Sequence, residues 1–166
     1  MSRKPATSGS ARHRRYDRFR ERVMFPIRNV KGEIVGFGGR IIGKGEPKYL
    51  NSPETTVFSK GNELYGLFEA RAAIRTEGCV IVVEGYMDVI ALVEAGFEAA
   101  VAPLGTAITE EQLRLLWRIH HEPIIALDGD TAGIRAAMRL VDLALPLLVA
   151  GQGLRFVILP EGMDPD

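Results

Sequence analysis

Cysteine and long apolar runs are scarce in this sequence, and each scarcity excludes a class of protein. The single cysteine, Cys79, excludes an internal disulfide and a cysteine-based zinc site within the chain, so zinc is not expected here. No run approaches the roughly 18 apolar residues of a membrane span, and the N-terminus lacks the apolar core of a signal peptide. We therefore expect a cytoplasmic protein that has no membrane partner.

A net charge of zero conceals an uneven distribution of charge. Residues 1–31 carry ten Lys or Arg and two Asp or Glu, whereas the remaining residues carry eleven and nineteen. This division favours a basic surface for a polyanion beside an acidic region that needs cations. A disordered basic leader and a solvated acidic face would give the same distribution, so charge alone does not decide between the two interpretations.

The first part of the chain is basic and rich in turn residues. Residues 1–15 have few apolar positions and predict a flexible lead-in. Residues 22–28 and 33–42 predict two strands that form a hairpin. A polar connection of about twenty residues follows the hairpin, and connections of that length in compact domains are usually functional or disordered.

From residue 64 onward, helical and strand patterns alternate. The first helix is expected over 64–78, and four short apolar runs follow amphipathic segments, a pattern typical of a parallel sheet covered by helices on both faces. Thr109 and Gln112 predict a capping box, and Pro146 should kink or split the last long helix. The predicted fold class is α/β, with a mostly parallel four-stranded sheet flanked by helices and preceded by a small β-rich subdomain.

Carboxylates follow three of the predicted strands. Glu84 ends the first strand, Asp128 and Asp130 end the third, and Asp164 and Asp166 follow the fourth. Because ligands of open parallel sheets bind beyond the carboxyl ends of the strands, these side chains are expected at one edge. Crowded carboxylates repel one another unless cations lie between them, and oxygen ligands favour Mg²⁺ or Mn²⁺ over zinc or copper. The pattern therefore predicts a magnesium site and phosphate chemistry.

Two of these acidic features have a second explanation. Asp128-Gly129-Asp130 alone has the composition of an ordinary turn, and only its combination with the other strand ends favours a metal site. Asp88 lies one turn into the next helix, where it either faces the same site or serves as a first-turn carboxylate stabilised by the helix dipole.

The acidic segments resemble a known family. VVEGYMDVIAL, LDGDTAG and the terminal DPD resemble the three acidic motifs of the Toprim fold, and more narrowly those of bacterial DnaG-type DNA primases. GFGGR and KYLNSPET are similar to the basic N-terminal subdomain of the primase polymerase core, which other Toprim enzymes lack. The resemblance covers roughly residues 16–166. It implies part of the basic N-terminal subdomain over 16–63 and a Toprim domain over 64–166 that is truncated at its third acidic motif.

The resemblance implies a function and a set of partners. The function is the synthesis of short RNA primers on single-stranded DNA at replication forks, by nucleotidyl transfer that depends on two or more Mg²⁺ or Mn²⁺ ions. The implied partners are the single-stranded template, ribonucleoside triphosphates, and the replicative helicase through a module absent from this chain.

The resemblance also implies roles for individual residues. It makes Glu84, Asp128 and Asp130 the catalytic and metal-binding centre, with further metal-binding carboxylates at Asp88, Asp164 and Asp166. DNA or nucleotide binding is implied for Arg18, Arg40, Lys48, Tyr49, Asn51 and Lys60.

Other functions stay open on the sequence alone. The chain could be part of another Toprim enzyme, a nuclease or a topoisomerase, or a non-catalytic nucleic-acid-binding module whose carboxylates only organise a structural ion. A HAD-type phosphatase also has Asp-x-Asp after a strand, but on the first strand of its sheet, whereas here the motif follows the third. Whether the isolated chain is active is a further open question.

Overall fold

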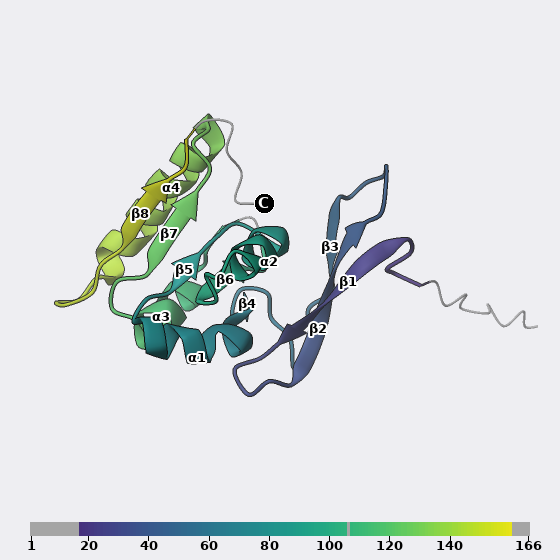
Figure 1. The fold of residues 1–166 in the computed structure, drawn as a ribbon, viewed down its shortest axis with the longest axis horizontal. Helices are drawn as coiled ribbons and strands as arrows, with labels where there is room; N and C mark the ends of the chain where they lie inside the picture. The colour runs from purple at the N-terminus through teal and green to yellow at the C-terminus, as the bar shows by residue number, and fades with distance from the viewer. Residues whose placement is uncertain (1–16, 106, 161–166) are drawn as a thin grey trace, which may run out of the picture.

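The protein contains two β-sheets that lie side by side in a computed structural model describing residues 17–105 and 107–160 (Figure 1). The predicted lead-in over 1–15 and the predicted ligands Asp164 and Asp166 lie outside the described residues. No helix in the described ranges is long and apolar enough to cross a membrane.

The small sheet has three antiparallel strands in the order β1 (Arg22–Arg28), β2 (Ile34–Ile41) and β3 (Tyr49–Asn51). The hairpin predicted from the sequence is confirmed as β1 and β2. Asn29 closes its turn, because the Asn29 side-chain oxygen accepts hydrogen bonds from the backbone amides of residues 31 and 33, at 2.9 and 3.1 Å. The third strand, β3, lies within the long polar connection.

The large sheet has five strands in the order β4-β6-β5-β7-β8. Its four parallel strands, as predicted, are β5 (Ile81–Val82), β6 (Ala100–Pro103), β7 (Ile124–Leu127) and β8 (Arg155–Ile158). The strand β4 (Leu64–Tyr65) adds an antiparallel edge by pairing with β6.

The start of the first helix was predicted wrongly. Residues 64 and 65 were expected in the helix, but they form β4, and α1 (Leu67–Glu77) begins only after Gly66. Gly66 has a φ of 79°, a left-handed conformation that glycine adopts without steric cost, and this residue separates the strand from the helix.

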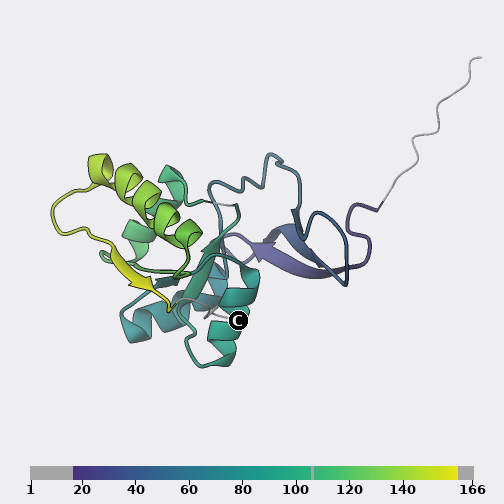
Figure 2. The same ribbon diagram turned by 90° about the horizontal axis from the view of Figure 1, so that it is seen from above.

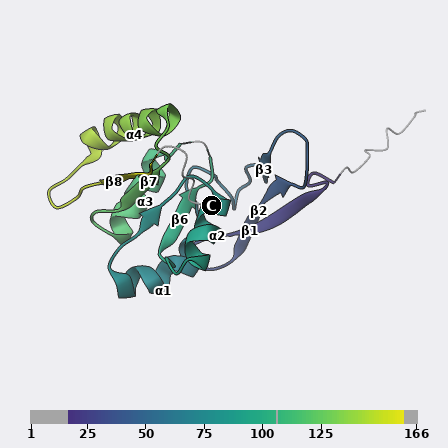
Figure 3. The same ribbon diagram turned by 45° about the horizontal axis from the view of Figure 1, so that its top comes forward.

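The remaining helices cover both faces of the large sheet. Of these, α2 (Tyr86–Glu94) lies on the face opposite α4 (Thr131–Ala144), and α3 (Glu110–Ile119) packs beside α4 (Figures 2 and 3). This arrangement follows from the strand order, in which β5 lies between β6 and β7. The chain crosses the sheet in one direction from β5 to β6 and in the opposite direction from β6 to β7. Because both crossovers are right-handed, their helices lie on opposite faces of the sheet. Pro146 ends α4 as predicted, in the short 3₁₀ helix η1 (Leu145–Leu147).

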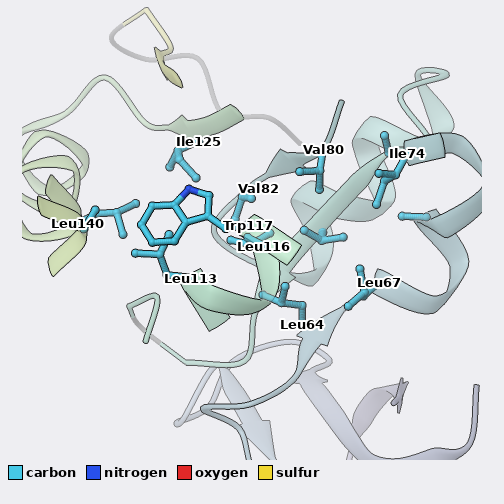
Figure 4. Close-up of a cluster of buried hydrophobic side chains, with 14 of the residues drawn as sticks. Leu64, Leu67, Ile74, Val80, Val82, Leu113, Leu116, Trp117, Ile125 and Leu140 are labelled. Atoms are coloured by element: carbon cyan, nitrogen blue, oxygen red, sulfur yellow. The ribbon is translucent and has the colours of Figure 1, made fainter. Parts of the chain in front are cut away.

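The main core lies between the large sheet and its helices. Trp117 of α3 packs among Leu113, Ile125 and Leu140, and its indole N–H donates to the carbonyl oxygen of Gly153 at 2.9 Å (Figure 4). Burying one large aliphatic side chain of this kind contributes about 1.5–3 kcal/mol. The helices and the large sheet therefore share one hydrophobic core.

A second cluster joins the two sheets. It contains Phe25 and Ile27 of β1, Phe58 of the connection, and Tyr86 and Leu104 of the α/β region. The small sheet thus buries Phe25 and Ile27 against residues that belong to the large sheet's helix and loop.

Candidate active site

The candidate site lies at the point where the order of the parallel strands reverses. The chain leaves β5 toward β6 and later returns to the other side of β5 as β7, with Val82 opposite Ile125. Glu84 follows β5 and Asp128 follows β7, so the two carboxylates lie at the carboxyl ends of neighbouring parallel strands. Both line one pocket of about 620 Å³, together with Asp88. Open α/β sheets bind their ligands at such switch points.

The pKa of Glu84 responds to its burial and to the negative charges at this edge. Burial raises the pKa of the Glu84 carboxyl, and the charge of Asp128 raises it further. A hydrogen bond with the backbone of Asp128 lowers the pKa, whereas Asp88 and Asp130 add smaller increases. These four residues, Glu84, Asp88, Asp128 and Asp130, are called the acidic edge below.

Two members of the acidic edge also start helices. Oδ2 of Asp88 accepts a hydrogen bond from the backbone N–H of Gly85 at 2.8 Å, in the first turn of α2. Oδ1 of Asp130 accepts from the backbone N–H of Gly133 at 2.7 Å and caps α4. Both carboxylates are therefore fixed by local backbone hydrogen bonds, and Asp88 combines its helix contact with a place in the pocket wall.

The start of α4 leaves no space for a side chain at residue 133. A Cβ atom on Gly133 would lie 2.0 Å from the carbonyl oxygen of Asp128, and backbone atoms do not yield as a flexible side chain does. Gly133 therefore lets α4 approach the end of β7 closely. This close approach keeps Asp128 and Asp130 together.

The small sheet contributes Lys48, Tyr49 and Asn51 to the same pocket. The side-chain amide of Asn51 donates to the carbonyl oxygen of Leu104 at 3.0 Å, and its oxygen accepts a hydrogen bond from the hydroxyl of Tyr86. Tyr86 begins α2 two residues after Glu84, so these contacts tie β3 to the acidic edge.

The other predicted nucleic-acid-binding residues lie outside this pocket. Arg40 faces Tyr49 across β2 and β3, Arg18 is exposed before β1, and Lys60 lies in the connection near α3. Within the described residues, the structure therefore brings together three members of the acidic edge with Lys48, Tyr49 and Asn51 in one pocket. Arg18, Arg40 and Lys60 do not line that pocket, although Arg40 pairs with Tyr49 in the small sheet.

Two family models match consecutive parts of the chain. The N-terminal domain of the DNA primase catalytic core matches residues 3–71, which include the small sheet. The Toprim domain matches residues 78–157, which include the acidic edge.

Curated DNA primases match nearly the whole chain. The DNA primase of Pseudomonas aeruginosa is 56% identical over 153 residues, which cover 92% of this chain and 23% of that protein. The DNA primase of Escherichia coli K12 is 54% identical over 153 residues, which cover 92% of this chain and 26% of that protein. The chain belongs to the bacterial DnaG-type DNA primase family. It spans about a quarter of the length of these curated primases.

Solved primase structures share the fold. A DNA primase domain from Pseudomonas aeruginosa has a TM-score of 0.88 and 54% identity, over 96% of this chain and 50% of that one. A DnaG primase catalytic domain bound to single-stranded DNA has a TM-score of 0.83 and 53% identity, over 91% of this chain and 49% of that one. The α/β class with its small basic subdomain is thereby confirmed as the fold of a primase catalytic core.

The donor chemistry of the primase acidic edge fits magnesium. Its donors are all oxygen atoms, and the charge of Asp128 adds to burial in raising the pKa of Glu84. Within the described residues, no three Asp, Glu, His or Cys side chains form a group that could hold an ion by themselves. Magnesium does not need such a group, because it is commonly bound by one or two carboxylates together with waters and substrate phosphates.

Sequence reasoning missed two residues that shape this site. Gly133 carries a signal that could have found it, since glycine is a poor helix former and here occupies the first turn of a helix. Arg22 carries no sequence signal that distinguishes it from the other arginines. Its guanidinium donates to the carbonyl oxygen of Pro47 at 2.8 Å and to that of Lys48 at 3.3 Å, and so holds the segment that presents Lys48.

Proposed function

We propose that this chain provides the catalytic centre of a DNA primase, a nucleotidyltransferase that makes short RNA primers on single-stranded DNA. The observation that carries the proposal is the pocket in which Glu84 and Asp128 lie together with Lys48 and Tyr49. A single-stranded template as partner is supported by the similar primase catalytic domain bound to single-stranded DNA. Ribonucleoside triphosphates are the proposed second substrate.

The acidic edge is the proposed binding site for two or more Mg²⁺ or Mn²⁺ ions. Glu84, Asp128 and Asp130 would hold them, with Asp88, Asp164 and Asp166 assisting. Bound ions of this kind supply positive charge to phosphate oxygens and activate a hydroxyl for attack. The carboxylates of this chain orient those ions, and their mutual repulsion makes the empty site less stable than the filled one.

The protein's own side chains would bind and orient the nucleic acid. Lys48 carries a positive charge for a phosphate, and its ammonium lies 5.6 Å from the centre of the Tyr49 ring. Tyr49 is 40% exposed, and its aromatic ring is the kind of side chain on which a base of single-stranded DNA stacks. The raised pKa of Glu84 suits its carboxylate oxygen to accept a proton from the attacking 3′-hydroxyl.

Primer synthesis tests the proposal directly. The assay uses single-stranded DNA with all four ribonucleotides, and compares this chain with a chimera in which it replaces the matching region of the Pseudomonas aeruginosa primase. We expect the chimera to make short RNA only when Mg²⁺ or Mn²⁺ is present. Asp128→Ala and Glu84→Gln should abolish the product in chimeras that remain folded by circular dichroism, whereas Glu94→Gln, on the exposed end of α2, should retain it.

The same assay separates the rival functions. Normal primer yield from folded Asp128→Ala would overturn the assignment of the acidic edge. Cutting or relaxation of supercoiled plasmid in place of primer synthesis would favour a nuclease or a topoisomerase. A topoisomerase needs a tyrosine nucleophile, and Tyr86 is poorly suited because burial raises its pKa to about 12. Single-stranded DNA binding without any nucleotide incorporation would favour a non-catalytic module.

A further inference from the structure

A buried glutamine of α3 holds the backbone around Lys60. The side chain of Gln112 belongs to a residue that is only 1% exposed, and its amide nitrogen makes two hydrogen bonds. Nε2 donates to the carbonyl oxygen of Lys60 at 2.9 Å and to that of Glu63 at 2.8 Å. Both amide hydrogens of Gln112 are therefore used on one short segment, residues 60–63, which precedes β4.

The same glutamine also caps its own helix. Oε1 of Gln112 accepts from the backbone N–H of Thr109 at 3.0 Å, and Oγ1 of Thr109 accepts from the backbone N–H of Gln112 at 3.1 Å. The Thr109 hydroxyl then donates to the carbonyl oxygen of Gly61 at 2.5 Å. Glutamate serves a capping box as well as glutamine does, because capping needs only the side-chain acceptor. The two hydrogen bonds that the Gln112 amide nitrogen donates are therefore not required to cap the helix.

Lys60 is held from its other side as well. Its backbone N–H donates to Oε1 of Glu54 at 3.1 Å, so side chains bind both polar groups of the Lys60 backbone. The Lys60 ammonium, by contrast, makes no hydrogen bond or ion pair within residues 17–105 and 107–160. The fold therefore fixes where this side chain starts and leaves its charge available to a ligand.

We propose that Gln112 is a positioning residue for nucleic-acid binding: it holds the backbone of Lys60 so that the Lys60 ammonium meets a phosphate of single-stranded DNA. The inference rests on the proposed function, which assigns Lys60 to nucleic-acid binding. It adds that the large sheet's helix α3, through Gln112, sets the position of a cation that lies outside the pocket.

The decisive variant is Gln112→Glu. The carboxylate keeps the acceptor that caps α3 and removes both donors to residues 60–63. Binding of a fluorescent single-stranded oligonucleotide to the chain is measured by anisotropy over a range of salt concentrations. Losing one phosphate contact reduces the slope of log K against log salt by about 0.7 for a single strand. We expect Lys60→Ala to show this reduction, Gln112→Glu to approach it, and the double variant to bind no more weakly than Lys60→Ala.

Controls separate positioning from stability. Trp117→Phe removes a side-chain hydrogen bond from the same helix without touching residues 60–63, so it should lower the melting temperature and leave the salt slope unchanged. If Gln112→Glu fails to fold, Gln112→Met is used, because it removes the donors without burying a charge.

Each outcome bears on a different claim. A wild-type slope for the folded Gln112 variants, or a further loss of affinity when they are combined with Lys60→Ala, would overturn the inference while leaving the proposed function intact. An unchanged slope for Lys60→Ala would overturn the inference together with the assignment of Lys60. Failure of the chimera to make primers would instead count against the proposed function, whatever the binding data show.

Discussion

The two sheets differ in what holds them in place. The large sheet is stabilised by its own helices around Trp117, whereas the small sheet packs Phe25 and Ile27 against Tyr86 and Leu104 of its neighbour. The carboxylates of the candidate site belong to the large sheet, and its cations belong to the small sheet. The acidic edge therefore depends on local packing, and the position of the basic residues depends on contacts with the large sheet.

A second set of contacts holds the far end of the small sheet. Arg71 of α1 donates to the carbonyl oxygen of Val30 in the hairpin turn at 2.8 Å. Phe68 of α1 fills the space beside Gly32, where a Cβ atom would lie 2.6 Å from the ring. The small sheet is thus attached at both ends, through α1 at the turn and through Tyr86 at the pocket.

The largest effect on stability is expected from Gly133→Ala, which tests whether the acidic edge depends on local packing. The added methyl would overlap the carbonyl oxygen of Asp128, and overpacking of this kind costs about 1–3 kcal/mol or more. Urea unfolding should show this loss, and primer synthesis should fall with it because Asp128 is displaced. Gly105→Ala is the matched control, since its Cβ meets nothing within 4 Å, and it should change stability by less than about 0.5 kcal/mol. Equal stability of the two variants would contradict the steric role of Gly133.

Charge at the acidic edge should make stability depend on pH and magnesium. Because the folded state raises the pKa of Glu84 above its ordinary value of 4.5, the folded protein holds this proton more tightly than the unfolded chain does. Stability from this group is present below the ordinary value and is lost as the pH rises through the raised pKa. Without divalent ions, Glu84→Gln should therefore be more stable than wild type at neutral pH, and the difference should shrink toward pH 4.5.

Magnesium should reverse this ranking. Titration with MgCl₂ at neutral pH should raise the melting temperature of wild type and raise that of Glu84→Gln much less, because an ion stabilises only the state that binds it. Glu94→Gln should follow wild type in both series. If magnesium stabilises Glu84→Gln as much as wild type, Glu84 is not a ligand.

Tyr86→Phe tests the attachment of the small sheet at the pocket. The change removes one hydroxyl and leaves the oxygen of Asn51 without its donor in a partly buried place, which costs about 1 kcal/mol. Urea unfolding should show this loss, and binding of single-stranded DNA should weaken because β3 is released. Tyr65→Phe is a matched control, because the Tyr65 hydroxyl makes no hydrogen bond within the described residues. A smaller loss for Tyr86→Phe than for Tyr65→Phe would refute the link.

The smallest effect is expected at the other attachment. Arg28 and Glu69 form an ion pair of 3.2 Å between β1 and α1, and their side chains are 35% and 58% exposed. Exposed pairs contribute about 0–1 kcal/mol, so Glu69→Gln should shift stability within that range and lose its effect in high salt. A large loss would show that the turn contributes more than the Tyr86 contact.

The difference between local packing and contacts between distant segments also explains which features the sequence could predict. The hairpin, the capping box of Thr109 and the helix break at Pro146 follow from local patterns, and the structure confirms them. The strand β4 was missed because its two residues give no periodicity and because its partner β6 lies almost forty residues away. No local pattern could show that Asn51 bonds to Tyr86 or that Gln112 bonds to Lys60. Those contacts form only when segments distant in sequence pack together.

The close approach of Tyr86 to β2 has one more consequence. Its ring lies where the Cβ of residue 38 would be, 2.7 Å from that position, so the aromatic ring rests directly on the backbone of Gly38. Phe25, which pairs with Gly38 across β1 and β2, stacks against the same ring with a centroid separation of 5.4 Å. Tyr86 of α2 thus rests on the backbone of one strand of the small sheet and on a side chain of the next, so a residue of another size at this place would change the distance between α2 and the small sheet.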